Sequence, residues 1–131
     1  MIAVLDASAA VSIVLKRSDS TEARKAACEA DELIAPGLFV CEVANTFWKY
    51  YHLSDMALAA CEQAVEKAVA LPDRYVSGEE LHMEAFSLAC LTDRTVYDML
   101  YLVLARRNNA VLVTVDESLK ETARKQSVRV V

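Results

Sequence analysis

Four acidic residues stand at the edges of apolar segments, although they are far apart in the chain. Asp6 and Asp116 each follow a short apolar run, Glu42 lies in a segment of helical spacing, and Asp98 lies in the first turn of an expected helix. Carboxylates that converged without a cation would repel one another and raise their own pKa values. Mg²⁺ and Mn²⁺ prefer oxygen-only ligands, so the pattern indicates a divalent-metal site if the four are brought together.

Each of these carboxylates also has an ordinary structural explanation. Asp6 and Asp116 would cap the helices that follow them. Asp98 stands three residues after Thr95, which is capping-box spacing, and its carboxylate suits the helix dipole. Glu42 alone would be a solvated-face residue. The prediction therefore rests on the combination, with Asp6 and Asp98 expected as direct ligands and Glu42 and Asp116 as the next candidates.

Other candidate ligands have less support. Glu117 is a rival carboxylate beside Asp116, whereas Asp93 stands in a polar loop where we expect solvation. His52 and His82 match no ligand pattern, and we expect surface or partly packed side chains. The cysteines have no spacing typical of zinc sites or disulfides, so we expect buried thiols. They are Cys28, Cys41, Cys61 and Cys90.

Predicted strands and helices alternate along the chain. Residues 1–6 form an apolar run without alternation, which is typical of a buried parallel strand ending at Asp6. Further strands are predicted at 33–35, 74–76, 110–115 and 128–130, and helices at 7–15, 19 to about 30, 38–51, 54–70, 77–91, 95–107 and 117–125. Asp19 and Glu22 have capping-box spacing for the second helix, and Asn108–Asn109 supply a left-handed turn.

This alternation predicts one α/β domain over residues 1–131. We expect a three-layer α/β/α sandwich with a short parallel sheet of four or five strands. Because the carboxyl ends of parallel strands meet at one edge of a sheet, Asp6 and Asp116 should face the same crevice.

The composition is that of a globular protein, with 55% hydrophobic and 25% charged residues. Charges interrupt the aliphatic stretches, which excludes a membrane-spanning helix, and Asp6 interrupts the first apolar run before it could form a signal peptide. We therefore expect a cytoplasmic protein. The net charge of −5 argues against a protein that coats nucleic acid by bulk electrostatics, but it is compatible with an enzyme whose carboxylates hold a metal.

Four motifs occur in the order and approximate separation of the motifs of PIN domains. They are Val4-Leu5-Asp6-Ala7-Ser8, Glu42-Val43-Ala44-Asn45, Thr95-Val96-Tyr97-Asp98-Met99-Leu100-Tyr101 and Leu112-Val113-Thr114-Val115-Asp116. The chain thus resembles the PIN-domain family over essentially its whole length. Its compact size is similar to that of the VapC-type toxins of toxin–antitoxin pairs.

The resemblance implies a PIN-like fold and a metal-dependent endoribonuclease that hydrolyses RNA to 5′-phosphate and 3′-hydroxyl products. Four carboxylates would bind one or two Mg²⁺ or Mn²⁺ ions, and three neighbours would orient them by hydrogen bonds. The carboxylates are those of Asp6, Glu42, Asp98 and Asp116, and the neighbours are Ser8, Asn45 and Thr114. A bound ion would lower the pKa of a water ligand and stabilise charge on the phosphoryl oxygens.

The resemblance also implies a VapB-type antitoxin, bound in a groove formed by the helices after the first strand, and a homodimer. Aromatic and aliphatic bulk at Trp48, Tyr50, Tyr51 and Leu53 fits such a surface, and packing against the next helix explains it equally well. Several basic residues, among them Arg17 and Lys49, have spacing compatible with phosphate contact, but the sequence assigns none of them to RNA.

Two other classes of protein fit part of the pattern. A phosphoacceptor receiver domain has a similar length, α/β alternation and an acidic metal pocket, but it needs a basic residue after a late strand where this chain has Asp116-Glu117-Ser118. A catalytically inactive PIN-like binding module is the second alternative. The presence of all four acids speaks against it.

Overall fold

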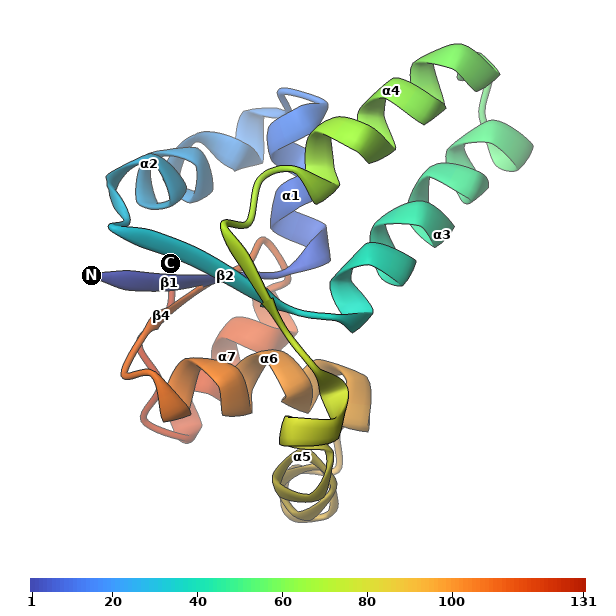
Figure 1. The fold of residues 1–131 in the computed structure, drawn as a ribbon. Coiled ribbons are helices and arrows are strands. Elements are labelled where there is room, and N and C mark those ends of the chain that lie inside the picture. The colour runs from blue at the N-terminus through green and yellow to red at the C-terminus, as the bar shows by residue number, and fades with distance from the viewer.

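The computed structural model describes residues 1–131 and shows one sheet between two layers of helices (Figure 1). The strands are β1 (Ile2–Leu5), β2 (Glu32–Pro36), β3 (Arg74–Val76) and β4 (Val111–Val113). All are parallel, in the order β3-β2-β1-β4. The central strand β1 pairs through Val4 with Ile34 on one side and Leu112 on the other. The predicted α/β/α sandwich is confirmed.

The helices divide between the two faces of the sheet. On one side lie α1 (Ala7–Val14), α2 (Thr21–Glu29), α3 (Leu38–Leu53) and α4 (Leu58–Val69), and on the other α5 (Gly78–Thr92), α6 (Val96–Arg107) and α7 (Glu117–Lys125) (Figure 1). The connections from β1 to β2 and from β2 to β3 cross one face, and that from β3 to β4 crosses the other. The strand order therefore reverses between β1 and β4. In open parallel sheets, ligands bind beyond the strand ends at such a point.

Helix α6 forms the centre of the layer beneath the sheet, where it contacts β1, β2 and β4. Seven consecutive residues, Met99–Ala105, are buried. A helix that is apolar on all sides is typical of a protein core. Asp98 immediately precedes this stretch, so a buried helix fixes its position. None of the helices is both long and apolar enough to cross a bilayer.

The helix starts differ in two places from the predictions. The fourth helix begins at Leu58 rather than Ser54, because Ser54 is the C-cap of α3 and its amide donates to the Tyr50 carbonyl oxygen. The capping box predicted from Asp19 is wrong. A short 3₁₀ turn, η1 (Ser18–Ser20), precedes α2, and the Asp19 carboxylate accepts a hydrogen bond from the Ser12 hydroxyl instead.

Two further predictions need correction. The last strand, predicted at 128–130, is reduced to one isolated parallel bridge between Val130 and Leu112. The cysteines were expected to be buried, but Cys61 alone is buried and the other three are exposed. Those three lie on the solvent-facing sides of helices α2, α3 and α5. The prediction had not considered on which side of its helix each cysteine lies. All four thiols are free.

Candidate active site

A single cavity at the carboxyl ends of β1 and β4 collects the four predicted acids. Its volume is about 370 Å³. Asp6 reaches it from the end of β1, Glu42 from α3, Asp98 from the first turn of α6 and Asp116 from the residue before α7. Ser8 and Asn45 also line the cavity, as predicted, whereas Thr114 is buried behind it and contacts Asp6.

The Asp6 carboxylate is fixed by three hydrogen bonds. Its Oδ1 accepts from the Ala9 amide at 2.9 Å and the Ser8 hydroxyl at 2.7 Å, and its Oδ2 accepts from the Thr114 hydroxyl at 2.7 Å. Asp6 therefore caps α1, as the sequence predicted, and its carboxylate also lines the cavity. Burial raises the pKa of Asp6 to about 6, and repulsion from Glu42 adds to the rise, although the three hydrogen bonds oppose it.

Glu42 is held by a buried tyrosine. The Tyr101 hydroxyl donates to Glu42 Oε1 at 2.5 Å, and Tyr101 is 3% exposed. Burial raises the pKa of Glu42, and repulsion from Asp98 adds to that rise while the Tyr101 hydrogen bond opposes it. Burial, followed by the charge of Glu42, raises the pKa of Tyr101 far above its usual range, so the hydroxyl remains a donor. Glu42 thus couples electrostatically to both Asp6 and Asp98.

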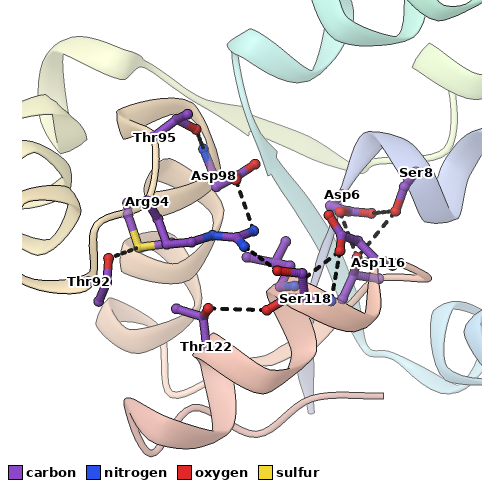
Figure 2. Close-up of polar contacts among 12 residues, drawn as sticks. Asp6, Ser8, Thr92, Arg94, Thr95, Asp98, Asp116, Ser118 and Thr122 are labelled. Carbon is purple, nitrogen blue, oxygen red and sulfur yellow. Dashed lines mark hydrogen bonds and ion pairs between the residues drawn. The ribbon is translucent and has the colours of Figure 1, made fainter.

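Asp98 is held by an arginine from the preceding loop. Arg94 donates from Nη2 to Asp98 Oδ2 at 3.0 Å and from Nη1 to the Ser118 hydroxyl, as Figure 2 shows. The Arg94 side chain therefore ties α6 to α7, while its buried Nε has no hydrogen-bond partner. The Thr95 hydroxyl accepts from the Asp98 amide at 3.2 Å, which confirms the predicted cap.

Asp116 caps α7 and joins the same network. Its Oδ1 accepts from the amides of Ser118 at 2.9 Å and Leu119 at 3.2 Å. The Thr114 oxygen accepts from the Asp116 amide at 3.1 Å while its hydroxyl donates to Asp6, so one side chain positions both acids. Figure 2 shows Asp6, Ser8 and Asp116 gathered together at the carboxyl ends of the strands.

The chemistry of this donor set fits Mg²⁺ or Mn²⁺, because every side chain in it offers oxygen. As they stand, no three acidic, histidine or cysteine side chains converge closely enough to ligate one ion directly. Each carboxylate is instead held by its own hydrogen-bond partner. Mg²⁺ usually keeps several waters and takes only one or two protein carboxylates, so this spacing is compatible with it. A cation would also relieve the repulsion among Asp6, Glu42 and Asp98.

The rival ligands lie outside the cavity. Asp93 is the left-handed C-cap of α5, with φ of 56°, and Glu117 is exposed at the start of α7. His52 packs against Trp48, with ring centroids 4.6 Å apart, and His82 contacts the Glu79 carbonyl oxygen. None of the four belongs to the lining.

Sequence reasoning gave no role to Arg94 or Tyr101, the residues that hold Asp98 and Glu42. Tyr101 lies one turn after Asp98 on α6, and Arg94 stands in the loop before that helix, four residues before Asp98. That spacing was the available signal for Arg94. The contact between Tyr101 and Glu42 spans 59 residues, so no local pattern could reveal it.

Comparison with known proteins shows the family to which the chain belongs. The PIN domain model matches residues 3–125. Ribonuclease VapC3 from Pyrobaculum aerophilum is 34% identical over 122 residues, which make up 90% of this chain and 92% of that protein. In fold, the chain is similar to PAE2754 from Pyrobaculum aerophilum, with a TM-score of 0.74, 24% identity, and coverage of 93% of this chain and 84% of that one.

A second solved structure with a similar fold is VapBC2 from Rickettsia felis bound to a DNA fragment from their promoter. The TM-score is 0.62 at 18% identity, and the match covers 100% of this chain and 98% of that one. The family match and the identity to the curated relative both extend over nearly the whole chain. The chain therefore belongs to the PIN-domain family and is of the VapC type.

Proposed function

We propose that this protein is a metal-dependent endoribonuclease and the toxin of a toxin–antitoxin pair. The observation that carries the proposal is the convergence of four carboxylates, from four distant segments, on one cavity beyond β1 and β4. The name of the similar protein Ribonuclease VapC3 supports RNA as the substrate. Asp6, Glu42 and Asp98 are the residues that we propose to hold Mg²⁺ or Mn²⁺, with Asp116 beside them.

The ion, when bound, would lower the pKa of a water ligand and stabilise negative charge on the phosphoryl oxygens. The protein's own contribution is to hold its carboxylates in place beforehand. Thr114 and Ser8 hold Asp6, Tyr101 holds Glu42, and Arg94 holds Asp98. Partners of this kind fix ligand orientation, and their loss typically weakens metal binding or activity.

We also propose that a VapB-type antitoxin binds beside α3 and α4. The structurally similar VapBC2 is a complex of this kind. Here α3 and α4 enclose an apolar hollow of about 210 Å³ and leave Trp48 55% exposed and Leu58 54% exposed beside it. Exposed apolar side chains that form one continuous patch mark interaction surfaces. Trp48→Ser and Leu58→Ser should therefore weaken copurification of the antitoxin, whereas Met83→Ser on α5 should leave it unchanged.

We also propose that the protein is a homodimer and that it is cytoplasmic. Apolar side chains are also exposed on α5, where Met83 is 63% and Phe86 54% exposed. Sedimentation equilibrium of the purified protein tests the dimer directly. A single species at the mass of one chain, 14.4 kDa, would contradict it.

The receiver-domain alternative does not fit the fold. Receiver domains have the flavodoxin-like strand order 2-1-3-4-5, whereas this sheet has the order β3-β2-β1-β4. The strand-end acids also lie in a protein that belongs to the PIN-domain family. The inactive binding module remains the competing function, and a cleavage assay separates it from the nuclease.

Cleavage of end-labelled RNA tests the proposal. Purified protein should cut structured or single-stranded RNA in Mg²⁺ or Mn²⁺, leave 5′-phosphate ends, and stop in EDTA. Asp98→Asn should abolish cleavage, while Asp93→Asn, which removes a carboxylate outside the cavity, should retain it. Equal cleavage by folded Asp98→Asn protein would overturn the proposal, and so would no cleavage of any RNA tested by wild-type protein.

A further inference from the structure

The active-site cavity also has a basic wall. Arg17 and Lys49 line it together with the four acids, and both side chains are exposed. Neither takes part in any of the ion pairs of the structure. In a protein with a net charge of −5, two unpaired cations beside an acidic cluster are available to bind an anion.

The backbone at Arg17 is held firmly. Lys16 has the left-handed conformation, with φ of 54°, and its amide donates to the Ile13 carbonyl oxygen. The Arg17 amide donates to the Ser12 carbonyl oxygen at 3.0 Å, which completes a Schellman motif after α1. The hydroxyl of buried Ser20 donates to the Arg17 carbonyl oxygen at 2.7 Å. These bonds fix the backbone from which the Arg17 side chain reaches the cavity.

The Arg17 side chain is also positioned. Its guanidinium carbon lies 5.4 Å from the centroid of the Tyr50 ring, which is a cation–π arrangement. Tyr50 itself packs against buried Phe47, with ring centroids 5.8 Å apart. The core therefore supports the tyrosine, and the tyrosine supports the arginine. A guanidinium plane fixed in this way can receive a phosphate or a stacked base.

Helix α3 connects this basic wall to the part of the cavity that the four carboxylates line. Glu42, Asn45 and Lys49 follow one another on a single face of α3 and all line the cavity. Glu42 and Lys49 are separated by seven residues, or about 10 Å along the helix. Lys49 is therefore offset along the helix from the carboxylates, which favours its contact with a neighbouring nucleotide.

We propose that Arg17, Tyr50 and Lys49 form the subsite for the RNA strand next to the cleaved phosphate. The inference rests on the proposed function, since it assumes that the acidic end receives that phosphate. Arg17 and Lys49 bind backbone phosphates of flanking nucleotides, and Tyr50 is a positioning residue that acts through Arg17. The strand then runs along α3, from the carboxylates toward the end of α1.

Binding of a short fluorescein-labelled single-stranded RNA, followed by anisotropy in EDTA, tests the subsite apart from catalysis. Arg17→Gln and Lys49→Gln should each weaken binding and lower the slope of log K against log salt by about 0.7. Lys67→Gln is the matched control, because Lys67 is exposed on α4, makes no ion pair and lies outside the cavity. It should change neither quantity.

A double-mutant cycle tests the role of Tyr50. Tyr50→Leu should weaken RNA binding in wild-type protein but add little in the Arg17→Gln background, because its effect passes through the arginine. Equal weakening by Lys67→Gln, full additivity in the cycle, or no RNA binding by the wild type would overturn the subsite. If binding behaves as expected but no RNA is ever cut, the proposed nuclease fails, and Arg17, Tyr50 and Lys49 form an RNA-binding site without cleavage.

Discussion

Replacement of Asp6 by asparagine should stabilise the metal-free protein at neutral pH. Asp6 is 6% exposed, and burial raises the pKa of its carboxyl from 3.8 to about 6. The folded protein therefore binds this proton more tightly than the unfolded chain. The contribution of Asp6 to stability is greatest below pH 3.8, falls as the pH rises toward about 6, and stays low above that. At neutral pH, the buried charge of Asp6 therefore lowers the free energy of unfolding by about 3 kcal/mol relative to a neutral carboxyl.

Asp6→Asn removes the charge but retains most of the contacts. An amide oxygen still accepts from the Ala9 amide and the Ser8 hydroxyl, and the NH₂ group donates to the Thr114 oxygen. Urea unfolding in EDTA at pH 8 should show a rise in the free energy of unfolding of up to about 3 kcal/mol. At pH 4 the gain should fall below about 1 kcal/mol, because folded wild-type protein then carries a neutral carboxyl.

The matched control for this experiment is Asp116→Asn. Asp116 caps α7, and asparagine caps a helix as well as aspartate does, so stability should change little at either pH. Mg²⁺ should narrow the difference between wild-type and Asp6→Asn protein, since an ion at 100 times the wild-type Kd adds about 2.7 kcal/mol to the wild type and less to the variant. If Asp6→Asn were destabilised at pH 8, or gained equally at both pH values, burial of the charge would not be the cause.

Three further changes have defined outcomes. Tyr101→Phe removes the hydroxyl 2.5 Å from Glu42 and should lower the initial rate of RNA cleavage about 10- to 100-fold; an unchanged rate would show that Glu42 needs no such partner. Lys16 has the left-handed conformation with φ of 54°, which glycine adopts without strain. Lys16→Gly should therefore raise the free energy of unfolding by about 1 kcal/mol in thermal denaturation, and a lower free energy of unfolding would contradict the assigned strain. Arg94→Gln removes the guanidinium 3.0 Å from Asp98 and should weaken Mn²⁺ binding about 10-fold by calorimetry, because Asp98 loses the partner that orients it; unchanged or tighter binding would contradict that role.

Most of the fold was predictable because its signals are local. Apolar runs predicted β1, β2 and β4, the segment 74–76 was also predicted as a strand, and Thr95 and Asp116 cap helices as expected. Asn109 has φ of 48°, so the asparagine pair makes the left-handed turn without glycine. The start of α4 was missed because Ser54 resembles an N-cap in the sequence, whereas tertiary structure makes it the C-cap of α3. Local capping patterns do not distinguish the end of one helix from the start of the next.

The candidate site was predictable to the level of its carboxylates. Asp6 and Asp116 meet because β1 and β4 are neighbours, which parallel-sheet topology implied. The side chains that hold the acids were not predictable in the same way. The family resemblance named Ser8 and Thr114 as neighbours of the acids, but the contact of Tyr101 with Glu42 spans 59 residues, and Arg17 depends on the Tyr50 ring that reaches it from α3. Contacts of this kind depend on packing, which no spacing in the sequence encodes.

Titration of Mn²⁺ into metal-free protein by calorimetry is the most direct test of the central claim that these carboxylates form a metal site. Wild-type protein and Asp93→Asn should bind the ion saturably, because Asp93 lies outside the cavity and asparagine tolerates its left-handed backbone. Asp6→Asn and Asp98→Asn should bind about 10-fold more weakly or worse. Equal affinity in all four folded proteins would contradict the metal site and, with it, the nuclease.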